Sequence, residues 1–256
     1  MPDFDTHRAL QKNRVRRRGI YLLPNLFTTA ALFAGFYAIV QAMNTNFDQA
    51  AVAIFIAMVL DSLDGRVARL TRTQSAFGAE YDSLADMVSF GAAPALVMYA
   101  WTLKGMGRLG WIAAFVYVAG AALRLARFNV MLDVTDKRWF TGLPSPAAAA
   151  LVAGFVWIVD DYIIDPGSIR EWAWAITVFA GLTMVSNVKY WSFKTINLKK
   201  SVPFLAMLMI VLFLALLSYQ PAHVLFGGFV AYALSGYVGT PWMMWKRRRS
   251  PPVPPP

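Results

Sequence analysis

The stretch DSLDGRVARLTRTQSAFGAEYDSLAD, residues 61 to 86, carries four aspartates inside a chain that is otherwise strongly apolar. Asp61 and Asp64 are three residues apart, and Asp82 and Asp86 are four apart, so each pair shares one face of a helix. Because a short basic connection joins the two segments, we expect the two acidic faces to meet. Four clustered carboxylates repel one another and are costly at a membrane, so the pattern predicts a cation between them.

The composition predicts an all-α protein, a polytopic membrane helix bundle. Of its 256 residues, 58% are hydrophobic and 15% are charged. A spanning helix needs about 20 mostly apolar residues, and the apolar runs predict about eight such transmembrane helices. These runs cover residues 20–43, 47–68, 83–103, 109–131, 145–164, 171–190, 202–219 and 222–244.

The chain is expected to divide into four parts. A basic cytoplasmic segment at 1–19 precedes a membrane domain at 20–195 that carries the recognisable motifs. A pair of transmembrane helices at 196–245 carries none and is interpreted as scaffold or lipid contact. A basic, Pro-rich disordered tail follows at 246–256.

Lysine and arginine predict the orientation, since positive loops stay in the cytoplasm. A cytoplasmic N-terminus places 21 of the 24 on that side and leaves Lys104, Arg108 and Arg170 on the other. Both termini are therefore predicted to be cytoplasmic. The net charge of +10 describes a basic face on anionic membrane lipids. A nucleic acid partner is not expected, because the charges border the spans instead of forming a separate domain.

The predicted cation site has oxygen ligands. The chain has no cysteine, and its two histidines, His7 and His223, lie outside the acidic stretch. Hard oxygen ligands suit Mg²⁺, Mn²⁺ or Ca²⁺. Two divalent ions would neutralise four carboxylates and bridge phosphate oxygens, an arrangement used for phosphoryl transfer.

The aspartates have two other readings. In the first, they form surface ion pairs with Arg66, Arg69 and Arg72. In the second, the protein is an ion-coupled transporter, since intramembrane carboxylates often mark ion pathways. Transporters tend to place such groups near the midplane on paired, interrupted helices, whereas these four cluster toward the predicted inner face.

The spacing D-x-x-D-G-x-x-A-R-x8-G-x3-D-x3-D resembles the signature of the CDP-alcohol phosphatidyltransferase family. Its fixed positions are Asp61, Asp64, Gly65, Ala68, Arg69, Gly78, Asp82 and Asp86. The resemblance implies an integral membrane homodimer that uses two Mg²⁺ or Mn²⁺ ions to transfer a phosphatidyl group from a CDP-linked lipid to an alcohol.

The same resemblance assigns roles to residues. The four aspartates would hold the metals, and Asp86 would also be the base that takes the proton of the incoming hydroxyl. The nucleotide would be bound by signature residues and by the N-x-x-T pair of LPNLFT. These residues are Asn25, Thr28, Asp61, Gly65, Ala68, Arg69 and Gly78.

Four further stretches resemble the branch of this family that uses serine. They are ADMVSFGAAPA at 85–95, LRLARFN at 123–129, FTGLPSPAAA at 140–149 and MVSNVKYWSFK at 184–194. The branch implies CDP-diacylglycerol and L-serine as substrates, and a bacterial or archaeal cytoplasmic membrane with the active site facing the cytoplasm. Glycerol 3-phosphate, inositol phosphate and choline remain alternative acceptors.

Serine needs a cation for its carboxylate. Arg124 and Arg127 lie three apart at the predicted cytoplasmic end of the fourth helix, so either could bind that group. Alternatively, both side chains extend to lipid phosphates, as arginine often does at helix ends.

Overall fold

The computed structural model describes residues 4–71, 73, 75–131, 139–192 and 204–249. Helices form almost all of this part, which confirms the all-α class. The elements are α1 (Phe4–Met43), α2 (Phe47–Thr71), α3 (Ala76–Asp86), η1 (Met87–Ala92), α4 (Ala93–Trp101), η2 (Leu103–Met106), α5 (Arg108–Met131), β1 (Trp139–Thr141), α6 (Ser145–Asp161), η3 (Pro166–Ile169), α7 (Arg170–Val185), β2 (Lys189–Trp191), α8 (Phe204–Tyr219) and α9 (Pro221–Arg249). Residues 250–256 of the predicted tail lie outside the described residues.

Several helices differ in extent from the predicted spans. The third helical segment begins at Ala76 instead of residue 83, because the Ser75 side chain caps it by accepting a hydrogen bond from the Gly78 amide. The sixth ends at Val185 instead of residue 190, because Ser186 is extended and the chain then enters β2. The first begins at Phe4, inside the basic segment expected at 1–19.

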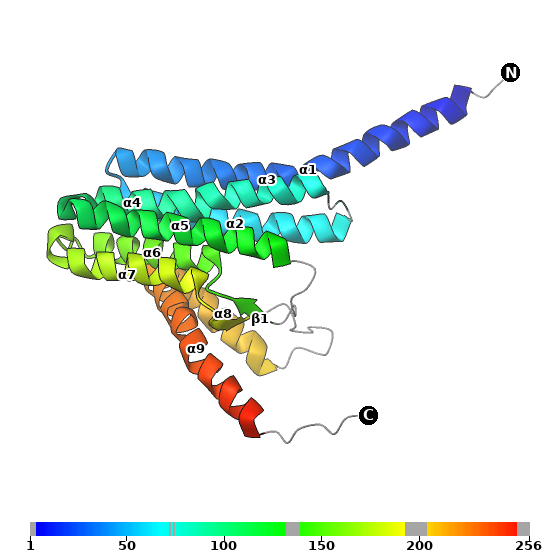
Figure 1. Ribbon diagram of the computed structural model, residues 1–256. Helices are drawn as coiled ribbons and strands as arrows, with labels where there is room; N and C mark the ends of the chain where they lie inside the picture. The colour runs from blue at the N-terminus through cyan, green and yellow to red at the C-terminus, as the bar shows by residue number, and fades with distance from the viewer. Residues whose placement is uncertain (1–3, 72, 74, 132–138, 193–203, 250–256) are drawn as a thin grey trace.

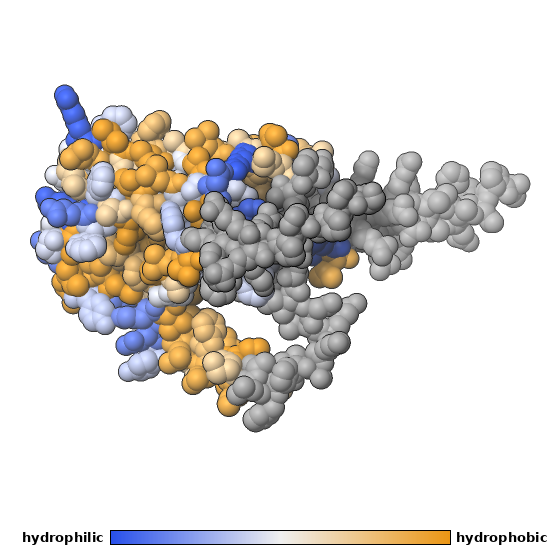
Figure 2. Space-filling model, turned by 60° about the horizontal axis from the view of Figure 1, so that its bottom comes forward, coloured by the Kyte–Doolittle hydropathy of each residue, from blue (hydrophilic) through white to orange (hydrophobic). Residues whose placement is uncertain are grey.

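Four described helical segments are long and apolar enough to cross a membrane, judged by length and composition. They are Pro24–Met43, Ala76–Trp101, Arg108–Met131 and Pro221–Gly239. Large apolar side chains such as Phe33, Phe115 and Val238 are mostly exposed, and hydrophobic residues cover much of the face in Figure 2. Such a surface fits lipid contact and supports a membrane protein, while the number of spans and their direction stay predictions.

Small residues pack the helices closely. On α6, which lies inside the bundle, every residue from Ala147 to Ala153 is buried. Where α5 meets α7, a Cβ atom on Gly120 would collide with the carbonyl oxygen of Gly181. Close backbone approach through glycine and alanine is typical of membrane helices, where packing has to replace the hydrophobic effect.

A short two-stranded antiparallel sheet, which the sequence pattern does not predict, joins two segments far apart in the chain. β1 pairs antiparallel with β2, with Phe140 opposite Tyr190. The Gly142 amide then donates to Val188 O at 2.8 Å, and the Leu143 amide donates to Thr183 O at 3.1 Å. These bonds fix the GLPSP segment at the start of α6 beside the end of α7.

The site-bearing helix ends gather at one end of the bundle. Figure 1 shows the C-terminal end of α2, the N-terminal end of α3, the C-terminal end of α5 and the β1–β2 sheet on the same side. The N-terminal part of α1 extends beyond this side, whereas α9 runs below the bundle. α1 bends as it leaves the bundle and contains Pro24, which lacks the amide donor that a regular helix needs.

Candidate active site

The four aspartates meet between α2 and α3. Carboxylate oxygens of Asp61, Asp64 and Asp82 all lie within 4.8 Å of one another. Across the helix pair, Asp64 is within hydrogen-bonding reach of Asp82, and Asp61 is within reach of Asp86. The structure thus brings together the two acidic faces that the spacing predicted to meet.

The donor set fits a divalent cation. Oδ1 of Asp82 is buried and has no hydrogen-bond partner within the described part of the chain. An ionised carboxylate can only accept hydrogen bonds, so adjacent buried carboxylates need protons or a cation between them. Asp61, Asp64 and Asp82 present oxygen atoms that could hold a hard metal ion.

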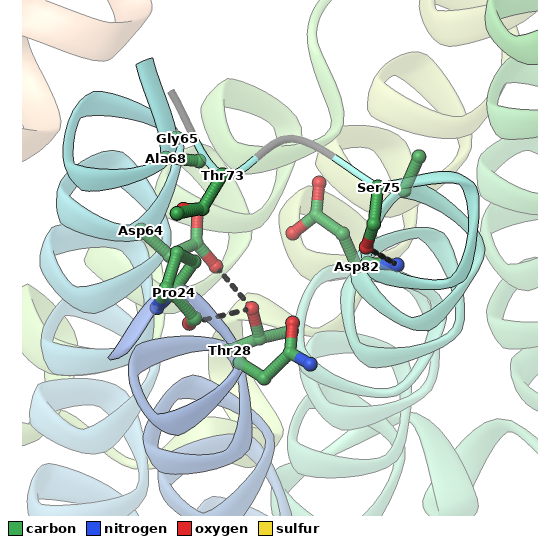
Figure 3. A pocket seen from close by; sticks show the side chains of 11 residues that line it. Pro24, Thr28, Asp64, Gly65, Ala68, Thr73, Ser75 and Asp82 are labelled. Carbon is green, nitrogen blue, oxygen red and sulfur yellow. Dashed lines mark hydrogen bonds between the residues drawn. The ribbon is translucent and has the colours of Figure 1, made fainter. Parts of the chain in front are cut away.

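Thr28 links α1 to this cluster. Its hydroxyl donates to Oδ2 of Asp64 at 2.7 Å and lies 3.2 Å from the carbonyl oxygen of Pro24 (Figure 3). Both Thr28 and Asp64 are buried. Thr28 is predicted as a nucleotide contact, and in the structure its hydroxyl also bonds an aspartate.

A cavity of about 330 Å³ opens beside the aspartates, between α1, α2 and α3. Asp64 and Asp82 face each other across it, with Thr28 between them (Figure 3). Its lining comprises Pro24, Asn25, Thr28, Asp64, Gly65, Ala68, Thr73, Ser75, Gly78, Ala79 and Asp82. Most of the predicted nucleotide-binding residues therefore share one cavity of a size usual for small-molecule sites.

Two predicted nucleotide contacts lie outside that lining. Asp61 faces the other aspartates, while Arg69 is exposed and interacts electrostatically with Asp64. Sequence reasoning also missed two lining hydroxyl groups, Thr73 and Ser75, because they fall in the unspecified gap of the signature. Thr73 is buried, with Oγ1 2.7 Å from that of Thr71.

Gly78 keeps the cavity open where α3 begins. A Cβ atom there would lie 3.1 Å from Oγ of Ser75 and 3.3 Å from Oδ1 of Asn25. Both neighbours line the cavity, so a larger residue would push them into it.

The two arginines proposed for serine have different partners. Nη1 of Arg124 donates to Oγ of Ser145 at 2.7 Å, and its guanidinium interacts electrostatically with Asp86. Arg127 instead donates from Nη2 to Oδ1 of Asn187 at 2.8 Å and from Nη1 to Val185 O at 3.4 Å. Arg124 therefore faces the aspartates, whereas Arg127 ties α5 to the end of α7.

Residues 21–186 match the family model described as CDP-alcohol phosphatidyltransferase. The chain belongs to this family. The match includes all four aspartates and the cavity, so the family's phosphatidyl transfer replaces the transporter reading.

Three curated relatives carry the name CDP-diacylglycerol–serine O-phosphatidyltransferase. The protein of that name from Helicobacter pylori (strain ATCC 700392 / 26695) is 37% identical over 229 residues, which is 89% of this chain and 94% of the relative. The Methanocaldococcus jannaschii protein is 40% identical over 137 residues, 54% of this chain and 61% of the relative. The Saccharomyces cerevisiae protein is 40% identical over 141 residues, half of each chain.

Proposed function

We propose that this protein is a CDP-diacylglycerol–serine O-phosphatidyltransferase. The serine hydroxyl oxygen forms a bond to the phosphorus that carries diacylglycerol, and the bond from that phosphorus to CMP breaks. The products are phosphatidylserine and CMP. The observation that carries the proposal is the meeting of four carboxylates beside a small-molecule cavity, with Arg124 next to Asp86.

The carboxylates of Asp61, Asp64, Asp82 and Asp86 are proposed to hold two divalent ions, Mg²⁺ or Mn²⁺. Bound there, the ions would neutralise the pyrophosphate and stabilise the charge that develops on the leaving phosphate. Thr28 keeps Asp64 turned toward this position through its hydrogen bond.

Asp86 is proposed to accept the proton of the serine hydroxyl. It lies on α3 within hydrogen-bonding reach of Asp61 and close to the Arg124 guanidinium. A neutral alcohol is a weak nucleophile, so a positioned base lowers the barrier to its attack.

The cavity is proposed to bind the cytidine nucleotide. Five of the residues that the resemblance implied line it, namely Asn25, Thr28, Gly65, Ala68 and Gly78. The hydroxyl groups of Thr73 and Ser75 extend the polar lining. Asp61 and Arg69, which lie outside the lining, are proposed to act at its edge toward the phosphates.

Arg124, not Arg127, is proposed to bind the serine carboxylate. A guanidinium has five N–H donors, so Arg124 can hold both Ser145 and a carboxylate. Its position beside Asp86 would bring the bound serine hydroxyl to the base. Arg127 already donates to two groups at the end of α7, where its role is structural.

The setting of the enzyme is proposed as well. The basic connections and termini predict a cytoplasmic active site in a bacterial or archaeal membrane. The homodimer implied by the resemblance is retained as a proposal, to be tested by cross-linking in the native membrane.

An acceptor screen tests the proposed function. Purified protein with CDP-diacylglycerol and Mn²⁺ or Mg²⁺ would be given radiolabelled serine, glycerol 3-phosphate, inositol phosphate or choline. Phosphatidylserine and stoichiometric CMP are expected with serine. Faster turnover of another acceptor would overturn the serine assignment while leaving the family's reaction in place.

A further inference from the structure

A π-helical turn directly follows Asp86. η1 spans Met87–Ala92, and at its end the Ala93 amide donates to the carbonyl oxygen of Val88, five residues back. A π-turn adds one residue to a helix without breaking it. Since each residue of an α-helix advances about 100°, the added residue rotates the face carrying Asp82 and Asp86 by that amount relative to α4.

α4 cannot rotate about its own axis to compensate for that rotation, because its buried residues fix its orientation. Its residues Ala93, Val97 and Met98 are fully buried in the core of the bundle. The direction in which the two aspartates point is therefore set by the geometry of the turn. π-turns occur often at functional sites, and this one lies between a buried helix and the proposed metal ligands.

Tyr117 on α5 completes the hydrogen bonding of the turn. The residue four positions after Phe90 is Pro94, which has no amide hydrogen to donate back to the Phe90 carbonyl. The Tyr117 hydroxyl donates to that carbonyl oxygen at 3.0 Å, and both side chains are fully buried. A Cβ atom on Gly91 would lie 3.2 Å from that of Ala121, so α5 packs closely on the turn.

A second contact from α5 lies on the other side of Asp86. Nδ2 of Asn129 donates to Oγ of Ser83 at 2.9 Å, and that hydroxyl lies 3.2 Å from Oδ1 of Asn129. α5 therefore forms hydrogen bonds to this helical segment three residues before Asp86 and four residues after it. Arg124 lies between these contacts and interacts with Asp86 itself.

We infer that Tyr117 and Asn129 are positioning residues that hold the rotation of the helix carrying Asp82 and Asp86. This inference rests on the proposed function, because the aspartates matter as metal ligands and base. Neither residue lies in the cavity lining. Tyr117 belongs to no motif, and Asn129 ends the LRLARFN stretch, to which no role had been given.

Tyr117→Phe is the sharpest test, because it removes one hydroxyl and keeps the ring. Mn²⁺ binding to the full-length protein in detergent is measured by electron paramagnetic resonance without substrate, and kcat and KM are measured at saturating Mn²⁺. Losing one hydrogen bond should weaken Mn²⁺ binding about 3- to 10-fold, with a fall in kcat of similar size. The KM values for both substrates should not change.

Tyr190→Phe is the matched control. Tyr190 is also fully buried, and its hydroxyl donates to Ala233 O at 2.9 Å, away from the turn. It should lower the melting temperature to a degree similar to Tyr117→Phe while leaving Mn²⁺ affinity and kcat unchanged. A difference between the two variants isolates positioning from general loss of stability.

Ser83→Ala and Asn129→Ala test the second contact even if Tyr117→Phe fails to fold. Each single variant should weaken Mn²⁺ binding. Because both changes remove the same contact between the two side chains, the double variant should bind Mn²⁺ no more weakly than the single variant with the lower affinity. Unchanged Mn²⁺ affinity and kcat in every folded variant would overturn the inference. A wild-type protein that binds no Mn²⁺ would instead overturn the proposed metal site itself.

Discussion

The Thr28 hydroxyl lies 2.7 Å from Oδ2 of Asp64 and joins α1 to the acidic cluster of α2. Both residues are buried, so loss of the hydroxyl leaves a carboxylate oxygen without its donor. Through this bond, a residue that lines the proposed nucleotide cavity also positions a proposed metal ligand.

Thr28→Val should therefore weaken divalent metal binding and turnover. The change preserves the shape of the side chain and removes one hydrogen bond to a charged group, so we expect a loss of about 10- to 100-fold in kcat/KM. Thr28→Ser, which keeps the hydroxyl, should retain most of the wild-type kcat/KM. Thr177→Val, which deletes a buried hydroxyl bonded within α7, should leave kcat/KM unchanged. Equal losses in Thr28→Val and Thr177→Val would contradict the role of the bond.

Excess EDTA should abolish turnover, because the carboxylates would then have no cation to organise the pyrophosphate. Asp61→Asn, Asp64→Asn and Asp82→Asn should each reduce kcat by at least about 100-fold while the protein still inserts and folds. Asp48→Asn, at an exposed position at the start of the same α2, is the control and should keep full activity. A variant of the three that turns over normally at saturating metal would remove that residue from the ligand set.

Asp86→Asn should separate the base from the ligands. The amide can still offer an oxygen to a metal but cannot take a proton, so kcat should fall far more than affinity for CDP-diacylglycerol. Binding is measured with the lipid nucleotide in the absence of serine. A parallel loss of binding and kcat would make Asp86 a structural residue.

Gly78→Ala should narrow the proposed nucleotide cavity. Its Cβ would crowd Ser75 and Asn25, and overpacking of this kind should raise KM for CDP-diacylglycerol about 5-fold or more, with little change in KM for serine. Gly228→Ala is the control, because nothing lies within 4 Å of the added atom. A normal KM in Gly78→Ala would place the nucleotide elsewhere.

The acidic cluster could be predicted because helix geometry is periodic. Residues three or four apart, such as Asp61 and Asp64, must share a face once the segment is helical. A short connection then limits how two such helices can lie. Part of the cavity lining could be predicted for the same reason, since Gly65 and Ala68 lie on the same side of α2 as Asp64.

Other features depend on contacts that local patterns do not encode. The partner of Arg124 is Ser145, on another helix, and the difference between Arg124 and Arg127 appears only once α6 and α7 are packed. Hydropathy placed the start of the third segment too late because the first turns of α3 carry Glu80 and Asp82. It also extended the sixth segment too far, because the apolar Val188 and Tyr190 continue the run although Tyr190 lies in a strand.

Arg124→Lys should be the variant that changes serine recognition. Lysine keeps the charge but loses the planar pair of donors, so KM for serine should rise about 10- to 100-fold while CDP-diacylglycerol binding is unchanged. Arg127→Lys is the matched control, since Arg127 holds Asn187 and the end of α7. Arg127→Lys should lower the stability of the protein and leave KM for serine nearly unchanged.

Serinol, which lacks the carboxylate, makes that comparison specific to the proposed contact. It should be a poor acceptor for the wild type. The wild type and Arg124→Lys should turn over serinol at similar rates, because the missing group is the one that Arg124 is proposed to bind. If Arg124→Lys instead lowers turnover of serinol and serine by the same factor, the arginine acts through Asp86 and not on the acceptor. If Arg127→Lys alone raises KM for serine, the two arginines exchange the roles that their hydrogen bonds to Ser145 and Asn187 indicate.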